Sequence, residues 1–212
     1  TGMNRFGFDL PAFRAFAAGR LCGNVSAEGI YSHFYRPEHA ETAARQFSLF
    51  GEFCREGERA FGKLIRHIAA TGGTIASPDY RLDMVRIGIG LYGYLPGGFA
   101  GALPLKRALT VCSTVAAVRE CAGGGAGYGE FGPVYGRLAA VRAGYADGFS
   151  RAGGVGNVNV LCMDAFLSRI PAEKYAEVCV FSDADAYAER NGTISYEALT
   201  RVCGRAERVY EG

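Results

Sequence analysis

The stretch Leu82-Asp-Met-Val-Arg-Ile-Gly-Ile-Gly-Leu-Tyr-Gly-Tyr-Leu-Pro96 decides how the rest of the chain is interpreted. Its centre, residues 84–91, is apolar except for Arg86 and two glycines. A short apolar run of this kind predicts a strand that is buried on both faces, as in a parallel sheet. Arg86 in such a strand needs a hydrogen-bond acceptor or a place at the open end of the strand.

Gly88 and Gly90 follow Arg86 and give the stretch a second property. Glycine lets the backbone approach a ligand closely, so that its N–H groups can bind an anion. A cation followed by accessible amides at the carboxyl end of a parallel strand therefore predicts a phosphate site. An arginine that caps the mouth of a barrel, with glycines that relieve packing, explains the same residues equally well.

Strand and helix segments alternate ahead of this stretch. The pattern predicts helices over 11–20 and 37–62 and strand ends within 1–8, 24–34 and 64–70. The alternation indicates βα units with parallel pairing. A closed eight-stranded barrel takes about 250 residues, and far fewer are present before the end of the stretch. We therefore expect an α/β region over residues 1–95 that is the back half of a (β/α)8 TIM-type barrel.

The pattern changes after a linker rich in glycine and proline at 96–105. Four β-rich segments separated by glycine clusters predict a mostly antiparallel β domain over 106–212, with Thr193 or Ser195 as the N-cap of a closing helix. The predicted strands are 108–119, 138–143, 155–161 and 178–181, and the predicted helix is 187–201.

Composition excludes several other classes of protein. The 212 residues are 49% apolar and carry a formal net charge of +2, which does not predict binding to nucleic acid or to a charged membrane surface. The seven cysteines are scattered without a C-x-x-C pair, which predicts reduced thiols in a cytoplasmic-type environment and neither a disulfide framework nor a zinc or other metal site. The chain shows neither a signal peptide nor an apolar stretch long enough to span a bilayer.

Residues 83–93, Asp-Met-Val-Arg-Ile-Gly-Ile-Gly-Leu-Tyr-Gly, resemble the last barrel strand of the alanine racemase family, whose members use pyridoxal 5′-phosphate (PLP). Five further segments resemble signatures of the same family, in the same order. They are Thr-Gly-Met-Asn-Arg-Phe-Gly-Phe at 1–8, Gly-Ile-Tyr-Ser-His-Phe at 29–34, Gly-Tyr-Ala-Asp-Gly-Phe at 144–149, Cys-Met-Asp at 162–164 and Thr-Ile-Ser-Tyr-Glu-Ala-Leu at 193–199. Six matches in order are far more specific than any one of them.

The resemblance implies a racemase that interconverts L- and D-alanine by two-base proton transfer at Cα and supplies D-amino acid for peptidoglycan. Serine stays open as a substrate, because the membrane-anchored serine and alanine racemases of glycopeptide-resistance operons share this domain. The protein is then cytoplasmic, or the cytoplasmic domain of a membrane-anchored protein. The family also implies a head-to-tail homodimer with shared active sites.

The resemblance assigns catalytic roles to Tyr145, Arg86, His33 and Arg5. Tyr145 is the base that acts across the subunit boundary, and Arg86 faces the pyridine nitrogen of the cofactor. A phenol has an ordinary pKa near 10, so the site must stabilise its anion. His33 and Arg5 are the candidates for this task and for orienting the substrate, with His33 bridging Arg86 and Tyr145. Taken alone, a tyrosine on a half-buried strand and a structural histidine are the commoner explanations.

The cofactor phosphate falls to Thr71, to the backbone amides of Gly88 and Ile89, and to the hydroxyl of Tyr196. Thr71 stands where the family usually has serine, so the hydroxyl is kept. The backbone N–H of Met163 is expected to approach the substrate carboxylate. Packing of Cys162-Met163 under a β turn is the competing explanation for that motif.

Two departures from the family pattern bear on activity. The family's cofactor-binding lysine lies in a first-strand segment that nothing here matches, and Lys63, Lys106 and Lys174 lack its context. The chain is also shorter than the family before Cys162. We therefore expect a C-terminal part, incomplete or inactive alone, with the lysine encoded ahead of Thr1. A non-catalytic remnant that binds PLP weakly or only dimerises is the alternative, and a decarboxylase of the same architecture is disfavoured.

Overall fold

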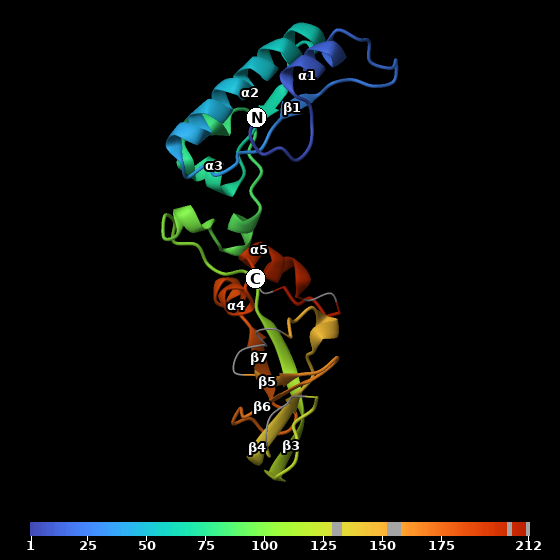
Figure 1. Ribbon diagram of the computed structural model, residues 1–212, viewed down its shortest axis with the longest axis vertical. Coiled ribbons are helices and arrows are strands. Elements are labelled where there is room, and N and C mark those ends of the chain that lie inside the picture. The colour runs from blue at the N-terminus through green and yellow to red at the C-terminus, as the bar shows by residue number, and fades with distance from the viewer. Residues whose placement is uncertain (129–132, 152–157, 203–204, 211–212) are drawn as a thin grey trace. The chain divides into compact units, whose positions relative to one another are not determined.

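The computed structural model describes residues 1–128, 133–151, 158–202 and 205–210 (Figure 1). The chain divides into two compact units, Thr1–Lys106 and Arg107–Gly212, which are described separately. Within the described residues, no helix is long and apolar enough to cross a membrane, and no group of acidic, histidine and cysteine side chains could hold a metal ion.

The first unit is built from parallel βα segments, as the sequence predicts. Strand β1 pairs in parallel with β2, with Tyr31 opposite His67. The pairing requires glycine at position 29, because a Cβ there would lie 2.7 Å from the carbonyl oxygen of Ile65. The elements are α1 (Leu10–Ala17), β1 (Gly29–Tyr31), α2 (Ala40–Phe61), β2 (Ile65–His67), α3 (Thr71–Ala76), and the 3-10 helices η1 (Pro78–Arg81), η2 (Ile89–Tyr92) and η3 (Gly97–Phe99).

The long helix α2 supplies most of the core of this unit. Its buried face carries Ala43, Phe50 and Cys54, which pack with residues that follow β1 and β2, Phe34 and Ile68 among them. The aromatic side chains at helical spacing, Phe47, Phe50 and Phe53, are therefore core residues.

The decisive stretch differs from the predicted strand over 84–91. Arg86 forms a single parallel bridge with Ala70, and its N–H donates to the Ala69 carbonyl over 3.0 Å. The backbone then turns at Gly88 (φ −111°, ψ −92°) into η2. The strand prediction is wrong beyond Arg86 because the N–H groups of Gly88 and Gly90 donate to Thr71 Oγ1 instead of to a neighbouring strand.

The second unit is a five-stranded antiparallel sheet, which confirms the predicted β domain. The strand order is β5-β6-β4-β3-β7. The three-residue strand β6 was not predicted, and residues 155–157 of the predicted strand 155–161 lie outside the described residues. The strands are β3 (Val111–Ala122), β4 (Tyr135–Val141), β5 (Val158–Leu161), β6 (Phe166–Ser168) and β7 (Glu177–Phe181).

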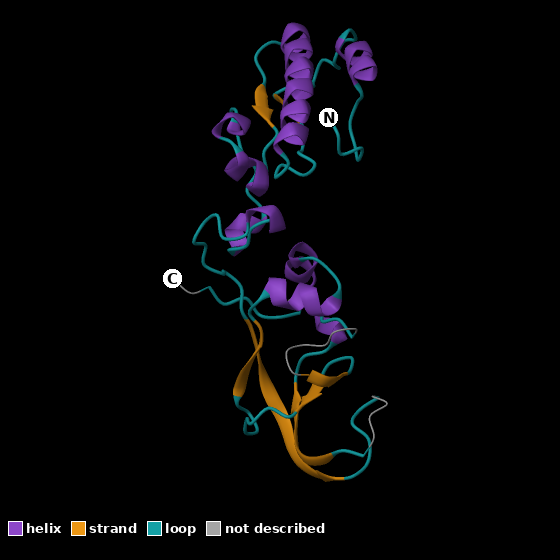
Figure 2. Ribbon diagram, turned by 60° about the vertical axis from the view of Figure 1, so that its left-hand side comes forward, coloured by secondary structure: helices purple, strands orange, loops and turns teal. Residues whose placement is uncertain are grey.

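Two helices, α4 (Ala184–Asn191) and α5 (Ser195–Arg201), lie at one end of this sheet instead of the single predicted helix (Figure 2). Gly192, in the left-handed conformation, ends α4. The N-cap of α5 is Ile194, so the predicted caps are wrong. The hydroxyl of Thr193 instead contacts Glu197, and that of Ser195 contacts Asp185.

Candidate active site

Arg86 ties together the carboxyl ends of β1 and β2. Its Nη2 donates to the Ser32 carbonyl over 2.7 Å and lies 3.3 Å from Nδ1 of His33. Its Nη1 contacts Nδ1 of His67. The guanidinium carbon lies 5.5 Å from the ring centroid of Tyr31, and that ring stacks on His67. The predicted pair of Arg86 and His33 is therefore in contact.

The two histidines must be neutral where Arg86 contacts them. A guanidinium has only donors, so Nδ1 of each imidazole accepts and the proton of each ring lies on Nε2. Burial lowers the pKa of His33, and the charges of Arg86 and Arg5 lower it further. Burial, followed by the charge of Arg86, also lowers the pKa of His67. The cluster thus holds one cation against neutral acceptors.

Sequence reasoning missed His67. Its signal was its place on the predicted strand 64–70, next to the strand that ends at Ser32-His33. Parallel pairing brings the carboxyl ends of neighbouring strands to the same edge, which places His67 beside the predicted site.

The neutral histidines make the first unit sensitive to acid. Between pH 7 and pH 5 the unfolded chain takes up protons on imidazoles with an ordinary pKa near 6.5, whereas the folded chain resists protonation. We therefore expect the urea midpoint, followed by far-UV circular dichroism, to fall as the pH is lowered through this window. Asp83, whose pKa Arg66 lowers to about 2 by hydrogen bonding, stays ionised throughout.

Replacement of both His33 and His67 by glutamine should flatten this dependence. His39→Gln, a change in the third histidine of the chain, is the matched control and should leave the slope unchanged. An unchanged slope in the double variant would show that other groups cause the acid sensitivity.

A cavity of about 430 Å³ brings Arg5 and His33 together. Both line it, together with Ser32 and several aromatic side chains of the first unit. The Arg5 guanidinium carbon lies 5.6 Å from the ring centroid of Phe6. The cavity is thus apolar over much of its wall and cationic near His33, which suits a small molecule with one anionic group.

Thr71 is in contact with the backbone of Gly88, the two residues to which the resemblance assigns the cofactor phosphate. Thr71 Oγ1 accepts from the N–H groups of Gly88 and Gly90, each over 3.3 Å. A Cβ placed on Gly88 would have no neighbour within 4 Å among the described residues, so its backbone borders open space. The bridge between Ala70 and Arg86 holds this pair next to the cationic cluster. Thr71 Oγ1 accepts both amides, so its own O–H is left to donate, and this hydroxyl beside the Arg86 cation fits the phosphate and ring nitrogen of PLP.

In the second unit the backbone joins Tyr145 to Met163. Tyr145 begins a 3-10 helix, η4 (Tyr145–Asp147), and its N–H donates to the Cys162 carbonyl over 3.0 Å. The next N–H, of Ala146, donates to the Met163 carbonyl over 2.9 Å. Both side chains are exposed. The predicted base and the predicted substrate contact are therefore neighbours on two adjoining loops.

Asp147 fixes the loop of Tyr145 from inside. Its carboxylate accepts from the Gly144 N–H over 2.8 Å and pairs with Arg205, whose Nη2 lies 2.8 Å from Oδ1. Gly144 itself has no room for a side chain, because a Cβ would lie 2.2 Å from the Met163 carbonyl oxygen.

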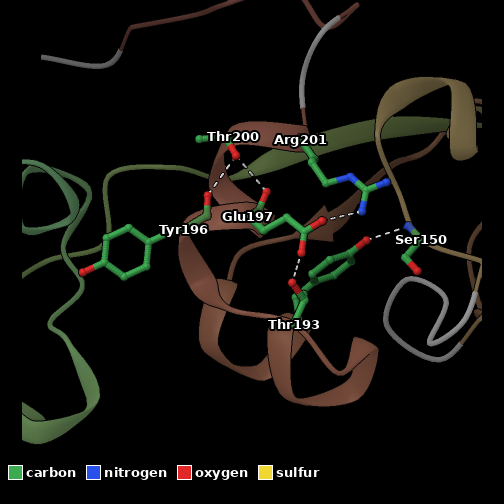
Figure 3. A network of polar contacts seen from close by, with 7 residues as sticks. Ser150, Thr193, Tyr196, Glu197, Thr200 and Arg201 are labelled. Carbon is green, nitrogen blue, oxygen red and sulfur yellow. Dashed lines mark hydrogen bonds and ion pairs between the residues drawn. The ribbon is translucent and has the colours of Figure 1, made fainter. Parts of the chain in front are cut away.

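Tyr196 lies on α5 and belongs to a different part of the second unit. Its carbonyl accepts from Thr200, while Glu197 on the same helix pairs with Arg201 over 2.8 Å and contacts Thr193 (Figure 3). The ring of Tyr196 points away from this network (Figure 3). The described contacts therefore hold the helix while its phenol stays outside the network.

Comparison with known proteins shows which family has this architecture. The family model described as "Alanine racemase, N-terminal domain" matches residues 1–96, and the model described as "Alanine racemase, C-terminal domain" matches residues 108–210. The solved alanine racemase of Clostridium difficile 630 has a TM-score of 0.86 and 29% identity over 99% of this chain and 62% of its own. The solved alanine racemase of Streptomyces coelicolor A3(2) has a TM-score of 0.85 and 29% identity over 99% of this chain and 64% of its own.

The fold is therefore that of a racemase with a TIM-type barrel and a C-terminal β domain. The chain belongs to the alanine racemase family. The alanine racemase of Chlorobaculum tepidum is 34% identical over 235 residues, which are 99% of this chain and 61% of that relative. The chain thus spans about three fifths of the length of the relatives it matches. That alignment has more positions than this chain has residues, so the relative also contains residues without a counterpart here.

Proposed function

We propose that the protein is a PLP-dependent amino-acid racemase of the alanine type, to which this chain contributes the back half of the barrel and the β domain. The observation that carries the proposal is the cluster of Arg86, His33 and His67 beside Thr71 and Gly88, all at one end of parallel strands. A family enzyme needs these functions at this place: a cation toward the ring nitrogen and donors toward the phosphate.

PLP, when bound, supplies an electron sink for the electron pair that remains at Cα after proton removal. Arg86 keeps its proton at neutral pH, although burial lowers its pKa. It would donate a hydrogen bond to the ring nitrogen of the cofactor, which would accept it. Its Nη1 contacts His67 and its Nη2 donates to the Ser32 carbonyl, so within the described residues Nε–H and the second N–H of Nη1 would remain as donors for the cofactor. Thr71 and Gly88 bind the phosphate, and Tyr196 and the Ile89 amide complete that binding.

Tyr145 moves the Cα proton on one face of the substrate, and the cofactor lysine moves it on the other. The Met163 N–H binds the substrate carboxylate, and Arg5 and His33 orient the substrate and favour the anion of the Tyr145 phenol. Alanine and serine both stay candidates. We propose a cytoplasmic enzyme, a head-to-tail homodimer with shared sites, whose D-amino acid product supplies peptidoglycan.

A non-catalytic remnant is the second candidate. It is favoured because none of the three lysines of this chain, all of which the structure describes, is placed to bind the cofactor. Lys63 is exposed in the loop before β2, Lys106 is exposed at the end of the first unit, and Lys174 lies over the Tyr175 ring. Within the described residues, none contacts the Arg86 cluster.

Racemisation by the complete gene product decides between the two. We expect conversion of L- to D-enantiomer with added PLP, assayed with alanine and serine side by side, and borohydride fixation of the cofactor. Arg86→Lys should lower kcat by about 10²-fold, because lysine cannot span acceptors on two strands. Arg66→Lys, a change in the half-buried arginine of β2 that pairs with Asp83, is the control. Absence of both conversion and fixation in the complete product would leave the remnant.

A further inference from the structure

Two cysteines that are far apart in the sequence lie opposite each other in the sheet of the second unit. Strands β3 and β7 lie side by side (Figure 1). Cys112 is on β3 and Cys179 is on β7, and the antiparallel register makes them direct partners. Both are exposed. Residues directly opposite in an antiparallel pair place their side chains on the same face of the sheet.

The hydrogen-bond pattern shows which kind of pair this is. The Thr114 carbonyl accepts from the N–H of Arg142, so the polar backbone groups of Thr114 face the β4 side of β3. The backbone N–H and C=O groups of successive strand residues point alternately to the two neighbouring strands. Those of Cys112, two residues before Thr114, therefore also point toward β4 and away from β7. Cys112 and Cys179 therefore form a non-hydrogen-bonded pair, the last pair before the register shift at Val111. In a regular pair of this kind the Cα atoms are about 4.5 Å apart and the side chains are closest. This spacing lies within the range that a disulfide requires.

The surroundings leave the pair accessible. The neighbours on the same face are Thr114 and Glu177, also directly opposite each other and also exposed. Cys54, by contrast, is buried in the first unit, where burial raises the pKa of its thiol to about 11 and makes it inert. A low-molecular-weight oxidant therefore has access to Cys112 and Cys179 and not to every thiol of the chain.

We propose that Cys112 and Cys179 form a reversible dithiol–disulfide site, with glutathione disulfide as the oxidant. One protein thiolate attacks a sulfur of glutathione disulfide, so that the S–S bond breaks, a mixed disulfide forms and one glutathione thiolate leaves. The second protein thiolate attacks the protein sulfur of the mixed disulfide and releases the second glutathione thiolate. Two electrons pass to glutathione disulfide, and the two protons of the protein thiols pass to the released glutathione.

The chain allows a direct test, because trypsin yields each cysteine on a peptide of its own. Cys112 lies in 108–119 and Cys179 in 175–190. We incubate the 212-residue chain with graded glutathione disulfide, block remaining thiols with N-ethylmaleimide, and analyse the monomer from a non-reducing gel by mass spectrometry. The expected product is a link between these two peptides that dithiothreitol removes.

Single variants separate the pair from isolated thiols. Cys112→Ser should retain glutathione on 175–190, because no second thiol can release it. Cys22→Ser removes an exposed cysteine of the first unit and should leave the link intact. A link that occurs only between two chains, or a link from Cys112 or Cys179 mainly to another cysteine, would overturn the proposal.

Phenylarsine oxide provides a second measurement that needs no oxidant. Its arsenic forms two bonds to sulfur with loss of water, so it reports two adjacent thiols directly. We expect each of Cys112→Ser and Cys179→Ser to weaken retention of the arsenical against excess monothiol by roughly 10²-fold, since the second bond becomes intermolecular. Equal retention by the unchanged chain and by both variants would show that the thiols do not meet.

Discussion

Gly148→Ala should destabilise the second unit more than the same exchange at the other positive-φ glycines described in that unit (Gly123, Gly124, Gly127, Gly136 and Gly192). Gly148 has φ +94°, and a Cβ on it would lie 1.9 Å from the Arg201 carbonyl oxygen and 2.6 Å from its carbon. Neither atom can move without a large cost in free energy, because both belong to the backbone at the end of α5. Either the loop of Tyr145 or the end of α5 must move. We expect a loss of about 3 kcal/mol in the free energy of unfolding.

Thermal unfolding of the chain measures this loss. For a unit of about a hundred residues, 3 kcal/mol corresponds to a fall in Tm of about 12 °C or more. Gly192→Ala is the matched control, because Gly192 also has positive φ (+61°) but a Cβ there meets nothing within 4 Å. It should cost about 1 kcal/mol, the penalty of the left-handed conformation alone. Equal losses in the two variants would mean that the loop does not pack tightly on α5.

Tyr145→Phe should remove catalysis while leaving the fold intact. The loop of Tyr145 is held by backbone hydrogen bonds to the carbonyls of Cys162 and Met163, and the side chain is 45% exposed, so the hydroxyl can be lost without opening a cavity. On the proposed function, loss of one acid–base group lowers kcat for racemisation by about 10²- to 10⁴-fold. Exchange of the Cα proton with deuterated solvent should fall much more for one enantiomer than for the other.

Two controls accompany this variant. Tyr128→Phe removes a hydroxyl from another exposed tyrosine of the same unit and should leave racemisation unchanged. In proven heterodimers, a Tyr145→Phe subunit paired with a subunit that lacks the cofactor lysine should recover partial activity, because one of the two shared sites is then intact. Equal loss of exchange for both enantiomers, or heterodimers without recovery, would contradict the role of Tyr145 as a base across the subunit boundary.

The sequence predicted those parts of the fold that are set by local periodicity. Helix α2 follows from its apolar spacing, and the antiparallel sheet follows from β-rich segments separated by glycines. The strand over 84–91 failed because a distant hydroxyl, Thr71, accepts the amides of Gly88 and Gly90 and turns the backbone away. Strand β6 has three residues, too few to show an alternating pattern.

The candidate site shows the same limit. Arg86 and Gly88 were found because they lie in a recognisable motif, and Thr71 was found because it stands where the family usually has serine. His67 was missed because only strand pairing places it against Arg86. In the same way, no pattern along the chain relates Cys112 to Cys179, and only the register of β3 and β7 shows them to be partners.

The backbone hydrogen bonds from Tyr145 and Ala146 to the carbonyls of Cys162 and Met163 have a consequence for sequence variation. The acceptors that hold the two loops together are main-chain carbonyl groups, which every residue type possesses. Exchange of the side chains at 162 and 163 therefore leaves these two hydrogen-bond acceptors in place, although the Cys162 side chain also packs against the core cluster of Ala126 and Val160. Gly144 and Gly148, by contrast, do not tolerate a side chain. A Cβ would lie 2.2 Å from the Met163 carbonyl oxygen at Gly144 and 1.9 Å from the Arg201 carbonyl oxygen at Gly148.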